Sequence, residues 1–266
     1  MAIELIRIAT RESPLALWQA EFVRDELLSR YPHLTVEIVG MTTKGDILLD
    51  MPLVKIGGKA LFVKELEVAM LENRADIAVH SMKDVPTILP PNTHLSAMLE
   101  REDTRDVFIT GEGGAGSIEG LADGSVIGTA SLRRQSQILA KNPTLKCVNF
   151  RGNVQTRLRK LDDGVVDATL LALAGLKRMG MEGCATKILE KEDMVPAVAQ
   201  GAIGLQIRSD DARSVKYSEA LNHEQTRVCV EAERTFLGEL DGNCRTPIAG
   251  QCWVGEGGEV LFEVRI

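Results

Sequence analysis

Hydrophobic and polar residues follow strand and helix periods in turn at the start of this chain. Residues 5–9 and 34–39 show short patterns typical of strands, and the segment between them places apolar residues at helical spacing. Ser13 followed by Pro14 is typical of a helix start, with a cap residue before proline at the first helical position. The apolar stripe of the predicted helix consists of Leu15, Trp18, Phe22 and Leu27. A strand–helix–strand order requires a crossover, so the pattern predicts a parallel sheet with ligands at the carboxyl ends of its strands.

Residues 76–86 are the stretch around which we expect the rest of the chain to be organised. Residues 77–79 form an apolar run too short for a helix, and Ser81, Lys83 and Asp84 follow directly. Open α/β sheets usually place their chemistry at the carboxyl end of a buried strand, where this lysine and this carboxylate would lie. From the local pattern alone, an ordinary turn with a solvated ion pair is an equally good interpretation.

A second α/β unit follows, and its strand-to-helix junctions carry arginine. Its strands are predicted at 107–110, 125–128, 145–150 and 168–173. The arginines at or just after the last three strands are Arg133, Arg134, Arg151, Arg157 and Arg178. Carboxyl ends of parallel strands share one edge, and helix starts favour anions. Because the planar arginine fork suits carboxylates, the pattern predicts an anion-binding cleft.

Two connections are predicted to join the units. Residues 100–106 contain no apolar residue and are expected to cross from the first unit to the second, and residues 197–208, which end as a strand, are expected to return. Further helices are predicted at 61–73, 210–221 and 224–240, a loop at 45–59, and further strands at 95–99, 248–254 and 259–266.

The distribution of charge supports the anion cleft. Between Ser131 and Arg178 ten Lys or Arg stand against three Asp, whereas the whole chain has a net charge of −7. A basic segment inside an acidic protein indicates a local anionic ligand, although a solvated helix face explains most charge runs. The overall charge argues against nucleic-acid binding, as does the content of aromatic residues, 4% of the chain.

Composition and cysteine usage limit the class of protein. With 266 residues, 44% hydrophobic and 26% charged, the chain can bury proper cores and shows no membrane-spanning run. The start enters a strand without a signal-type leader, and the five cysteines form no C-x-x-C pair, so we expect a cytoplasmic protein without a metal site. Cys244 lies in a polar turn beside Arg245, a setting that favours thiolate, although a packed structural thiol is the commoner case.

Several motifs together resemble the porphobilinogen deaminase (hydroxymethylbilane synthase) family. They are RIATRESPLA at 7–16, LFVKELE at 61–67, HSMKDVP at 80–86, SLRR at 131–134, RGNV at 151–154, AGLKR at 174–178, PAVAQG at 196–201 and the loop around Cys244. The resemblance runs from the first strand to at least Val254.

The resemblance implies a fold and an activity. The expected fold is α/β, with two periplasmic-binding-protein-like domains (1–99 with 197–219, and 105–196) flanking a cleft and a small α+β third domain at 222–266. The expected activity, in heme and porphyrin biosynthesis, is a transferase that joins four porphobilinogen molecules head to tail into hydroxymethylbilane, releasing ammonia, on a covalent dipyrromethane primer. A monomer with no nucleic-acid or membrane partner is expected.

The resemblance also implies roles for individual residues. Asp84 matches the catalytic carboxylate and Cys244 the thioether attachment point of the dipyrromethane. The residues that match the cofactor and substrate binders are Arg11, Ser13, Gln19, Ser81, Lys83, Thr129, Ser131, Arg133, Arg134, Arg151, Arg157 and Arg178. Three further residues would face the cleft: Lys55 and Lys59 from the loop at 45–59, which is expected to be mobile, and Phe62 from the helix after it.

The alternative reading is a cytosolic two-lobed anion-binding protein of the same build. It would need the arginines but would have no use for Asp84 or for an exposed Cys244, and fold alone does not distinguish the two functions.

Overall fold

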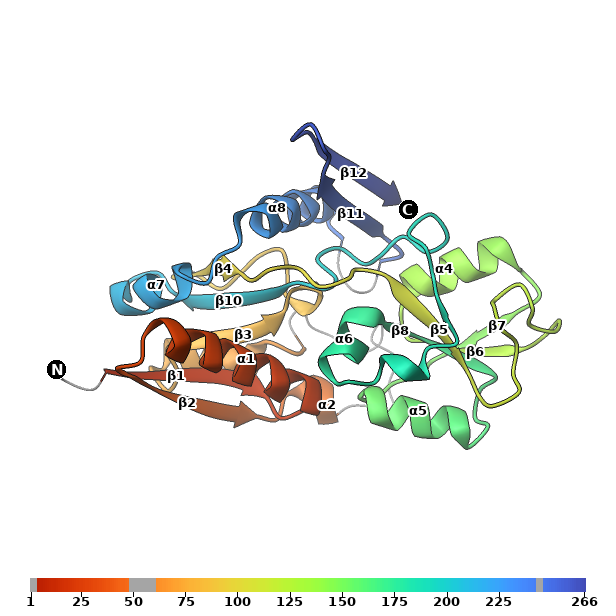
Figure 1. The fold of residues 1–266 in the computed structure, drawn as a ribbon, viewed down its shortest axis with the longest axis horizontal. Helices are drawn as coiled ribbons and strands as arrows, with labels where there is room; N and C mark the ends of the chain where they lie inside the picture. The colour runs from red at the N-terminus through yellow and green to blue at the C-terminus, as the bar shows by residue number, and fades with distance from the viewer. Residues whose placement is uncertain (1–3, 48–60, 243–245) are drawn as a thin grey trace.

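The computed structural model describes residues 4–47, 61–242 and 246–266. Figure 1 shows two lobes side by side, each built on a sheet, with a third unit of one helix and a hairpin above the junction between them. No described helix combines the length and the apolar character that a bilayer crossing requires.

The first lobe is a five-stranded mixed sheet in the order β2-β1-β3-β10-β4. Its strands are β1 (Glu4–Arg11), β2 (Leu34–Met41), β3 (Ile77–Ser81), β4 (Thr93–Met98) and β10 (Ile203–Arg208). The predicted parallel pairing is correct for β1 with β2 and β3. It is wrong for the rest of the sheet, because β10 returns from much later in the chain and runs antiparallel between β3 and β4. The helices of this lobe are α1 (Pro14–Arg30), α2 (Lys44–Ile47), α3 (Lys64–Leu71) and α7 (Ala212–Glu219).

Helix α1 begins where the sequence indicates, but its buried face coincides only in part with the predicted apolar stripe, at Leu27. Ser13 has the extended backbone of a cap residue, and the buried positions are Gln19, Ala20, Val23 and Leu27. Phe22, predicted to be part of the buried stripe, is 39% exposed and stacks on Trp18 instead. The small Ala20 lets the helix approach the sheet, and Gln19 can be buried because it has a hydrogen-bond partner, Ser81.

The second lobe repeats this arrangement, in the order β7-β6-β8-β5-β9. Its strands are β5 (Asp106–Thr110), β6 (Val126–Gly128), β7 (Lys146–Val148), β8 (Ala168–Ala172) and β9 (Lys187–Ile188), and its helices are α4 (Leu132–Lys141), α5 (Val154–Asp162) and α6 (Leu173–Arg178), followed by the short turn η2 (Glu182–Cys184). β6 is parallel to β7 and β8, while β5 is antiparallel to β8 and β9. The three arginine-bearing junctions therefore meet at one edge, as predicted.

Two connections cross between the lobes and lie against each other. One leads from β4 to β5 and the other from β9 to β10. Gly201 has φ +87°, and a Cβ there would lie 2.4 Å from the carbonyl oxygen of Glu102, so only glycine allows this backbone contact. Asp106, predicted to end the first connection, is instead the first residue of β5 and fully buried.

The third unit consists of α8 (Glu224–Glu239), β11 (Ala249–Val254) and β12 (Val260–Arg265). Glu233 on α8 is fully buried, and its carboxylate accepts hydrogen bonds from Arg101 Nη1 at 2.6 Å, Ala199 N at 2.6 Å and Cys252 N at 2.6 Å. One carboxylate thus joins the helix, the hairpin and both connections.

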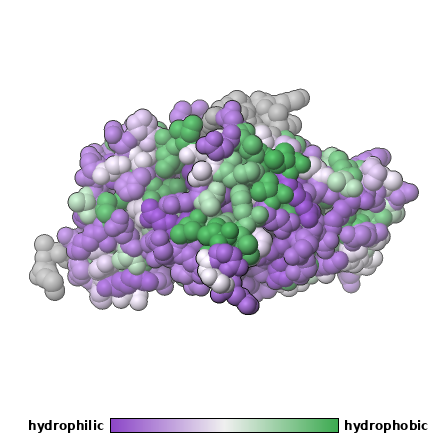
Figure 2. Space-filling model, turned by 90° about the horizontal axis from the view of Figure 1, so that it is seen from above, coloured by the Kyte–Doolittle hydropathy of each residue, from purple (hydrophilic) through white to green (hydrophobic). Residues whose placement is uncertain are grey.

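The outer surface of the third unit carries an apolar patch. Figure 2 shows hydrophobic side chains gathered over it, and Val260, Leu261 and Phe262 of β12 are 52%, 38% and 38% exposed. Among the described strands β12 pairs with β11 alone. Because the hairpin has so little core of its own, we expect its position to depend strongly on the contacts of Glu233.

Replacing Glu233 by Gln should lower the free energy of unfolding by about 3–5 kcal/mol, because it leaves the Arg101 guanidinium buried without a counter-charge. Thermal unfolding followed by circular dichroism would measure the loss. The matched control is Glu231→Gln on the same helix, because the Glu231 carboxylate pairs with Arg227 but is 56% exposed, and its loss should cost less than about 1 kcal/mol. Equal melting temperatures for the two variants would contradict the role given to Glu233.

Candidate functional site

Three adjoining cavities lie between the lobes, and together we call them the cleft. The Asp84 cavity is lined by Lys83, Asp84, Thr129, Ser131, Arg133, Arg134, Arg157 and Thr246, with apolar neighbours. The Arg178 cavity is lined by Gln19, Ser81, Lys83, Arg134, Arg157 and Arg178, and the Arg11 cavity by Arg11, Ser13, Asp46, Phe62 and Arg151, each with further neighbours. Every predicted site residue that the structure describes lines one of these cavities. Lys55, Lys59 and Cys244 lie outside the described residues.

Strand β3 delivers the central polar residues. It is buried up to Ser81 and continues as the short turn η1 (Met82–Asp84), which is held in place by the buried Met82. The Met82 N–H donates to the carbonyl oxygen of Ala202 at 3.0 Å. Lys83 and Asp84 are therefore carried, half-buried, to the edge of the first sheet, where the local sequence pattern predicted them.

His80, just before this turn, is a packed residue. It is 4% exposed, and its Nε2 lies 3.0 Å from Gln206 Oε1. Burial lowers the pKa of His80 to about 4 despite this hydrogen bond, so the ring is neutral at physiological pH and does not face the cleft.

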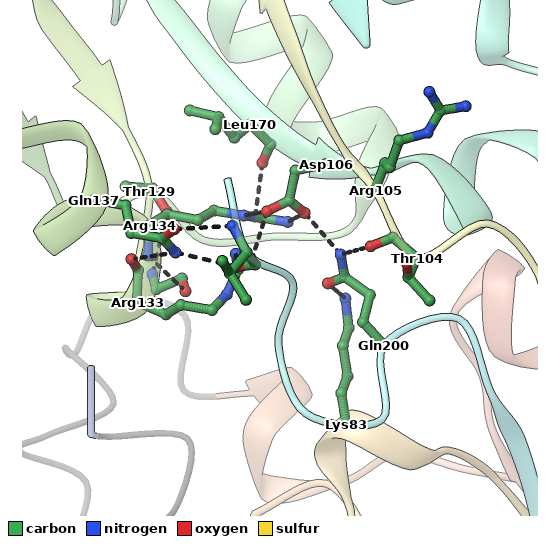
Figure 3. Close-up of polar contacts among 12 residues, drawn as sticks. Lys83, Thr104, Arg105, Asp106, Thr129, Arg133, Arg134, Gln137, Leu170 and Gln200 are labelled. Atoms are coloured by element: carbon green, nitrogen blue, oxygen red, sulfur yellow. Dashed lines mark hydrogen bonds and ion pairs between the residues drawn. The ribbon is translucent and has the colours of Figure 1, made fainter. Parts of the chain in front are cut away.

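The start of α4 holds two arginines against a carboxylate that the sequence reading missed. The Ser131 hydroxyl caps the helix and accepts from the Arg134 N–H at 3.4 Å. Arg133 Nη2 lies 2.6 Å from Asp106 Oδ2, and Arg134 Nη2 lies 2.8 Å from Asp106 Oδ1 (Figure 3). Burial alone would raise the pKa of Asp106, but the two guanidinium groups hold it well below its usual range. The apolar run directly after Asp106 was the available signal that this carboxylate begins a buried strand.

Gln200 links this cluster to the first lobe. Its amide nitrogen donates to Asp106 Oδ1 at 2.8 Å and to the carbonyl oxygen of Thr104 at 2.7 Å, and its amide oxygen accepts from Lys83 Nζ at 3.3 Å. Burial, followed by the charge of Arg134, lowers the pKa of Lys83 to about 8. Gln200 belongs to one of the quoted motifs, but its sequence position alone indicated no role.

Arg157 and Arg178 are cations without a carboxylate within 4.0 Å among the described residues. Arg157 Nε donates to the carbonyl oxygen of Gly152 at 3.0 Å, and Arg178 Nη2 donates to that of Gly201 at 2.6 Å. Burial lowers the pKa of each to about 10, and both remain charged at neutral pH. They can therefore offer free N–H donors to an anion.

The Arg11 cavity is arranged differently. Arg11 pairs with Asp46, a partner that the sequence did not indicate, and its guanidinium lies 4.6 Å from the centre of the Phe62 ring. Arg151 is 5% exposed and its Nη2 donates to the carbonyl oxygen of Gly45 at 3.3 Å. This arrangement places α2 and the start of α3 directly across the cleft from the second lobe.

The cleft therefore suits a ligand that carries several carboxylates and one developing positive charge. Asp84 is the one acidic side chain among the described residues that line its cavity. Arginine and lysine surround it, and the serine, threonine and glutamine side chains add neutral donors. The described residues contain no group of three or more His, Cys, Asp or Glu that could hold a metal ion.

A larger cavity of about 540 Å³ lies behind the connections, against α8 and β11, but contains none of the predicted residues. The charges that line it are largely satisfied within the protein, by the ion pairs of Arg101 with Glu233 and of Arg105 with Asp103 and Glu190. The cleft, and not this larger cavity, is therefore the candidate site.

Comparison with known families gives two matches that leave little of the chain uncovered. The model of the porphobilinogen deaminase dipyromethane cofactor binding domain matches residues 6–216, and the model of the porphobilinogen deaminase C-terminal domain matches residues 227–263. These are the segments that carry the cleft and the third unit.

Curated relatives agree with the family matches. The chloroplastic porphobilinogen deaminase of Oryza sativa subsp. japonica is 58% identical over 264 residues, which are 98% of this chain and 73% of the relative. The chloroplastic porphobilinogen deaminase of Pisum sativum is 56% identical over 263 residues, which are 97% of this chain and 71% of the relative.

Two solved structures share the fold at low sequence identity. The VFT2 domain of Bordetella pertussis BvgS matches with a TM-score of 0.50 and 14% identity over 89% of this chain and 92% of that one. A probable amino-acid ABC transporter extracellular-binding protein of Bacillus subtilis matches with a TM-score of 0.51 and 11% identity over 88% and 97%. They confirm the predicted two-lobed, periplasmic-binding-protein-like fold.

Replacing His80 by Gln should make the protein lose less stability when the pH is lowered. The pKa of His80 is about 4 in the folded protein and about 6.5 in an unfolded chain. Between these values the unfolded state binds more protons, so stability falls as pH falls from about 6.5 to about 4, by up to about 3 kcal/mol for this one group.

Urea unfolding of the wild type and of His80→Gln across this pH range measures the effect. His94→Gln, on β4, is the control and should leave the loss of stability as in the wild type. An identical pH dependence for the wild type and His80→Gln would contradict a buried, neutral His80.

Proposed function

Because the chain belongs to the porphobilinogen deaminase family, we propose that the cleft is its active site, with Asp84 as the catalytic carboxylate and Cys244 as the attachment point of the cofactor. The enzyme is a transferase of porphyrin biosynthesis that polymerises four porphobilinogen molecules head to tail into hydroxymethylbilane, with release of ammonia, on a dipyrromethane primer. The observation that supports the assignment of residues is the position of Asp84, which is the one carboxylate among the described residues of a cavity lined with cations. The family assignment favours the enzyme over the alternative of a simple anion-binding protein.

The residues around Asp84 fit a dipyrromethane. Arg133 Nε is buried and has no hydrogen-bond partner among the described residues, and the Arg157 guanidinium has no carboxylate partner there. Carboxylates are the ligands that such donors require, and a dipyrromethane carries four of them. When bound, it supplies the free pyrrole position to which the first substrate is joined. Lys83, Ser131, Arg133 and Arg134 would hold its carboxylates.

Asp84 acts on the substrate through charge. Loss of ammonia from porphobilinogen leaves a cation that is delocalised over the pyrrole ring and its N–H. A fixed carboxylate beside that N–H stabilises the developing charge, and a site with little water makes this stabilisation strong. We further propose that Asp84 assists the protonation of the leaving amine. Because the turn η1 fixes Asp84 through the buried Met82, little reorganisation is needed at the moment of reaction.

The other cations bind the carboxylates of the incoming porphobilinogen and of the growing product. Arg157 and Arg178 are free for this purpose, whereas Arg11 must exchange Asp46 for a ligand or act through the Phe62 side of the cavity. Ser13, Gln19, Ser81, Thr129 and Arg151 complete the set of proposed contacts. For Lys55 and Lys59 the family match alone supports a place at the cleft.

The attachment of the cofactor to Cys244 is supported by a residue two positions further on. Thr246 lines the Asp84 cavity together with Leu237 of α8 and Ile248. The described chain thus meets the Asp84 cavity two residues after Cys244 in the sequence, and the neighbouring Arg245 favours the thiolate that forms the carbon–sulfur bond.

The domain boundaries, the oligomeric state and the compartment belong to the same proposal. The cleft is built by one chain, which supports a monomer of three domains: 1–99 with 197–219, 105–196 and 222–266. The cysteine usage supports a reducing compartment. The cytoplasm is the expectation from the sequence, and the names of both relatives give the chloroplast as theirs.

Intact-protein mass spectrometry tests the cofactor assignment. The purified enzyme should be heavier than its polypeptide by two linked pyrrole units, and adding porphobilinogen should produce further, evenly spaced masses. Cys244→Ser should abolish these additions, whereas Cys147→Ser, which changes a half-buried thiol on β7, should not. Active protein with the bare polypeptide mass would refute the assignment of Cys244.

Replacing Asp84 by Asn should leave the fold and the cofactor mass unchanged but lower kcat by about 10²–10³-fold, because the carboxylate that stabilises the cation is lost. Steady-state rates of porphobilinogen consumption measure this. Asp25→Asn, at an exposed position of α1, is the control and should match the wild type. Turnover of Asp84→Asn near the wild-type rate would overturn the catalytic role.

A further inference from the structure

The geometry points to one more residue that the reaction depends on. We propose that Asp106 is a positioning residue, which holds Arg133 and Arg134 and, through Gln200, Lys83 in a single array of cations that receives the carboxylates of the cofactor. The proposal rests on the proposed function of the cleft, and it assigns to Asp106 a role without contact with substrate.

All the hydrogen-bonding capacity of Asp106 is used inside the protein. Its Oδ2 accepts from Arg133 Nη2 at 2.6 Å and Arg134 Nε at 3.3 Å. Its Oδ1 accepts from Arg134 Nη2 at 2.8 Å and Gln200 Nε2 at 2.8 Å. The side chain has no exposed surface and does not line any of the three cavities of the cleft. Asp106 can therefore influence a ligand only through the residues that it holds.

Each arginine is also fixed at a second point. Arg133 Nη1 donates to the carbonyl oxygen of Val195 at 2.6 Å, and Arg134 Nη1 donates to that of Leu170 at 2.8 Å. Figure 3 shows both side chains converging on Asp106 from α4. With two anchors each, the guanidinium planes have one orientation, and their remaining N–H groups are directed before a ligand arrives. Such preorganisation is what makes fixed donors effective.

Gln200 extends the array to the first lobe. Its amide can be oriented in only one way, because its nitrogen faces two acceptors, Asp106 Oδ1 and the carbonyl oxygen of Thr104, while its oxygen faces the Lys83 ammonium (Figure 3). Lys83 precedes Asp84 on the same turn. The spacing between the proposed catalytic turn and the arginines of the second lobe is thus set through one buried amide.

Removing the charge of Asp106 would disturb the array in a predictable way. In Asp106→Asn the new amide group is a donor that faces guanidinium donors, and two adjacent buried cations lose their counter-charge. Arg133 and Arg134 should then repel each other and turn away from their present orientation. Arg157 and Arg178, which Asp106 does not contact, should keep theirs.

A merely structural role for Asp106 can be distinguished with a matched buried carboxylate. Asp76 is 1% exposed and pairs with Arg7 at 3.1 Å and Arg213 at 2.9 Å in the first lobe, away from the cleft. Asp76→Asn therefore removes the same kind of buried ion-pair network. If Asp106 only stabilised the fold, both variants would lower the melting temperature and neither would change cofactor loading.

The experiment compares the intact mass and kinetics of the wild type, Asp106→Asn and Asp76→Asn, each purified as the full chain. The fraction carrying the cofactor mass should fall in Asp106→Asn, and kcat/KM of the loaded fraction should fall about 100-fold. Asp76→Asn should be fully loaded, with wild-type kcat and KM. Full loading and unchanged kinetics in Asp106→Asn, or equal loss of loading in both variants, would overturn the proposal.

A second variant keeps the test decisive if Asp106→Asn does not fold. Gln200→Leu retains the pairs of Asp106 with both arginines but cuts the link to Lys83, so the cofactor should still load while kcat/KM falls about tenfold. Wild-type kinetics in Gln200→Leu would contradict the array. A wild-type enzyme without any cofactor mass would instead refute the proposed function itself, which separates the two failures.

Discussion

Two arginines can lie side by side at the centre of this molecule because a carboxylate is buried with them. Taking a cation out of water is costly unless a counter-charge and hydrogen bonds replace the water, and Asp106 supplies both for Arg133 and Arg134. The second sheet begins at this carboxylate, α4 begins at the arginines, and the connection that returns to the first lobe is attached through Gln200. The fold and the anion-binding character of the cleft therefore depend on the same ion cluster.

Glu233 is a second buried carboxylate that compensates a largely buried cation, here Arg101. It neutralises Arg101 and also accepts from two backbone N–H groups, one on the returning connection and one on β11. The two connections are in direct backbone contact at Gly201 and Glu102. Asp106 and Glu233 hold the returning connection at two adjacent residues, Gln200 and Ala199. The third unit is thereby tied to the junction of the lobes and not to one lobe alone.

The sequence predicted those parts of the site that are encoded locally. The strand that ends at Ser81 and the turn that carries Asp84 follow from a few consecutive residues, and the arginine junctions follow from the rule that parallel strands share an edge. The partners of these residues could not be predicted, because they are distant in sequence: Arg133 and Asp106 are 27 residues apart, and Lys83 and Gln200 are 117 apart. The mixed sheet was missed for the same reason. The exposure of Phe22 was missed because an apolar stripe does not indicate which of its edges faces the sheet. The roles of the residues came from the family resemblance, not from the pattern.

The place of β10 in the first sheet has a consequence for synthesis on the ribosome. β4 pairs with β10 alone among the described strands, yet β10 is translated after the entire second lobe. The strands of that second lobe form one uninterrupted stretch, from Asp106 to Ile188, so its sheet can close while β3 and β4 still expose unpaired edges. Pairings between distant segments form slowly and leave such edges open to aggregation in the meantime. The lobe that is made first is therefore completed last.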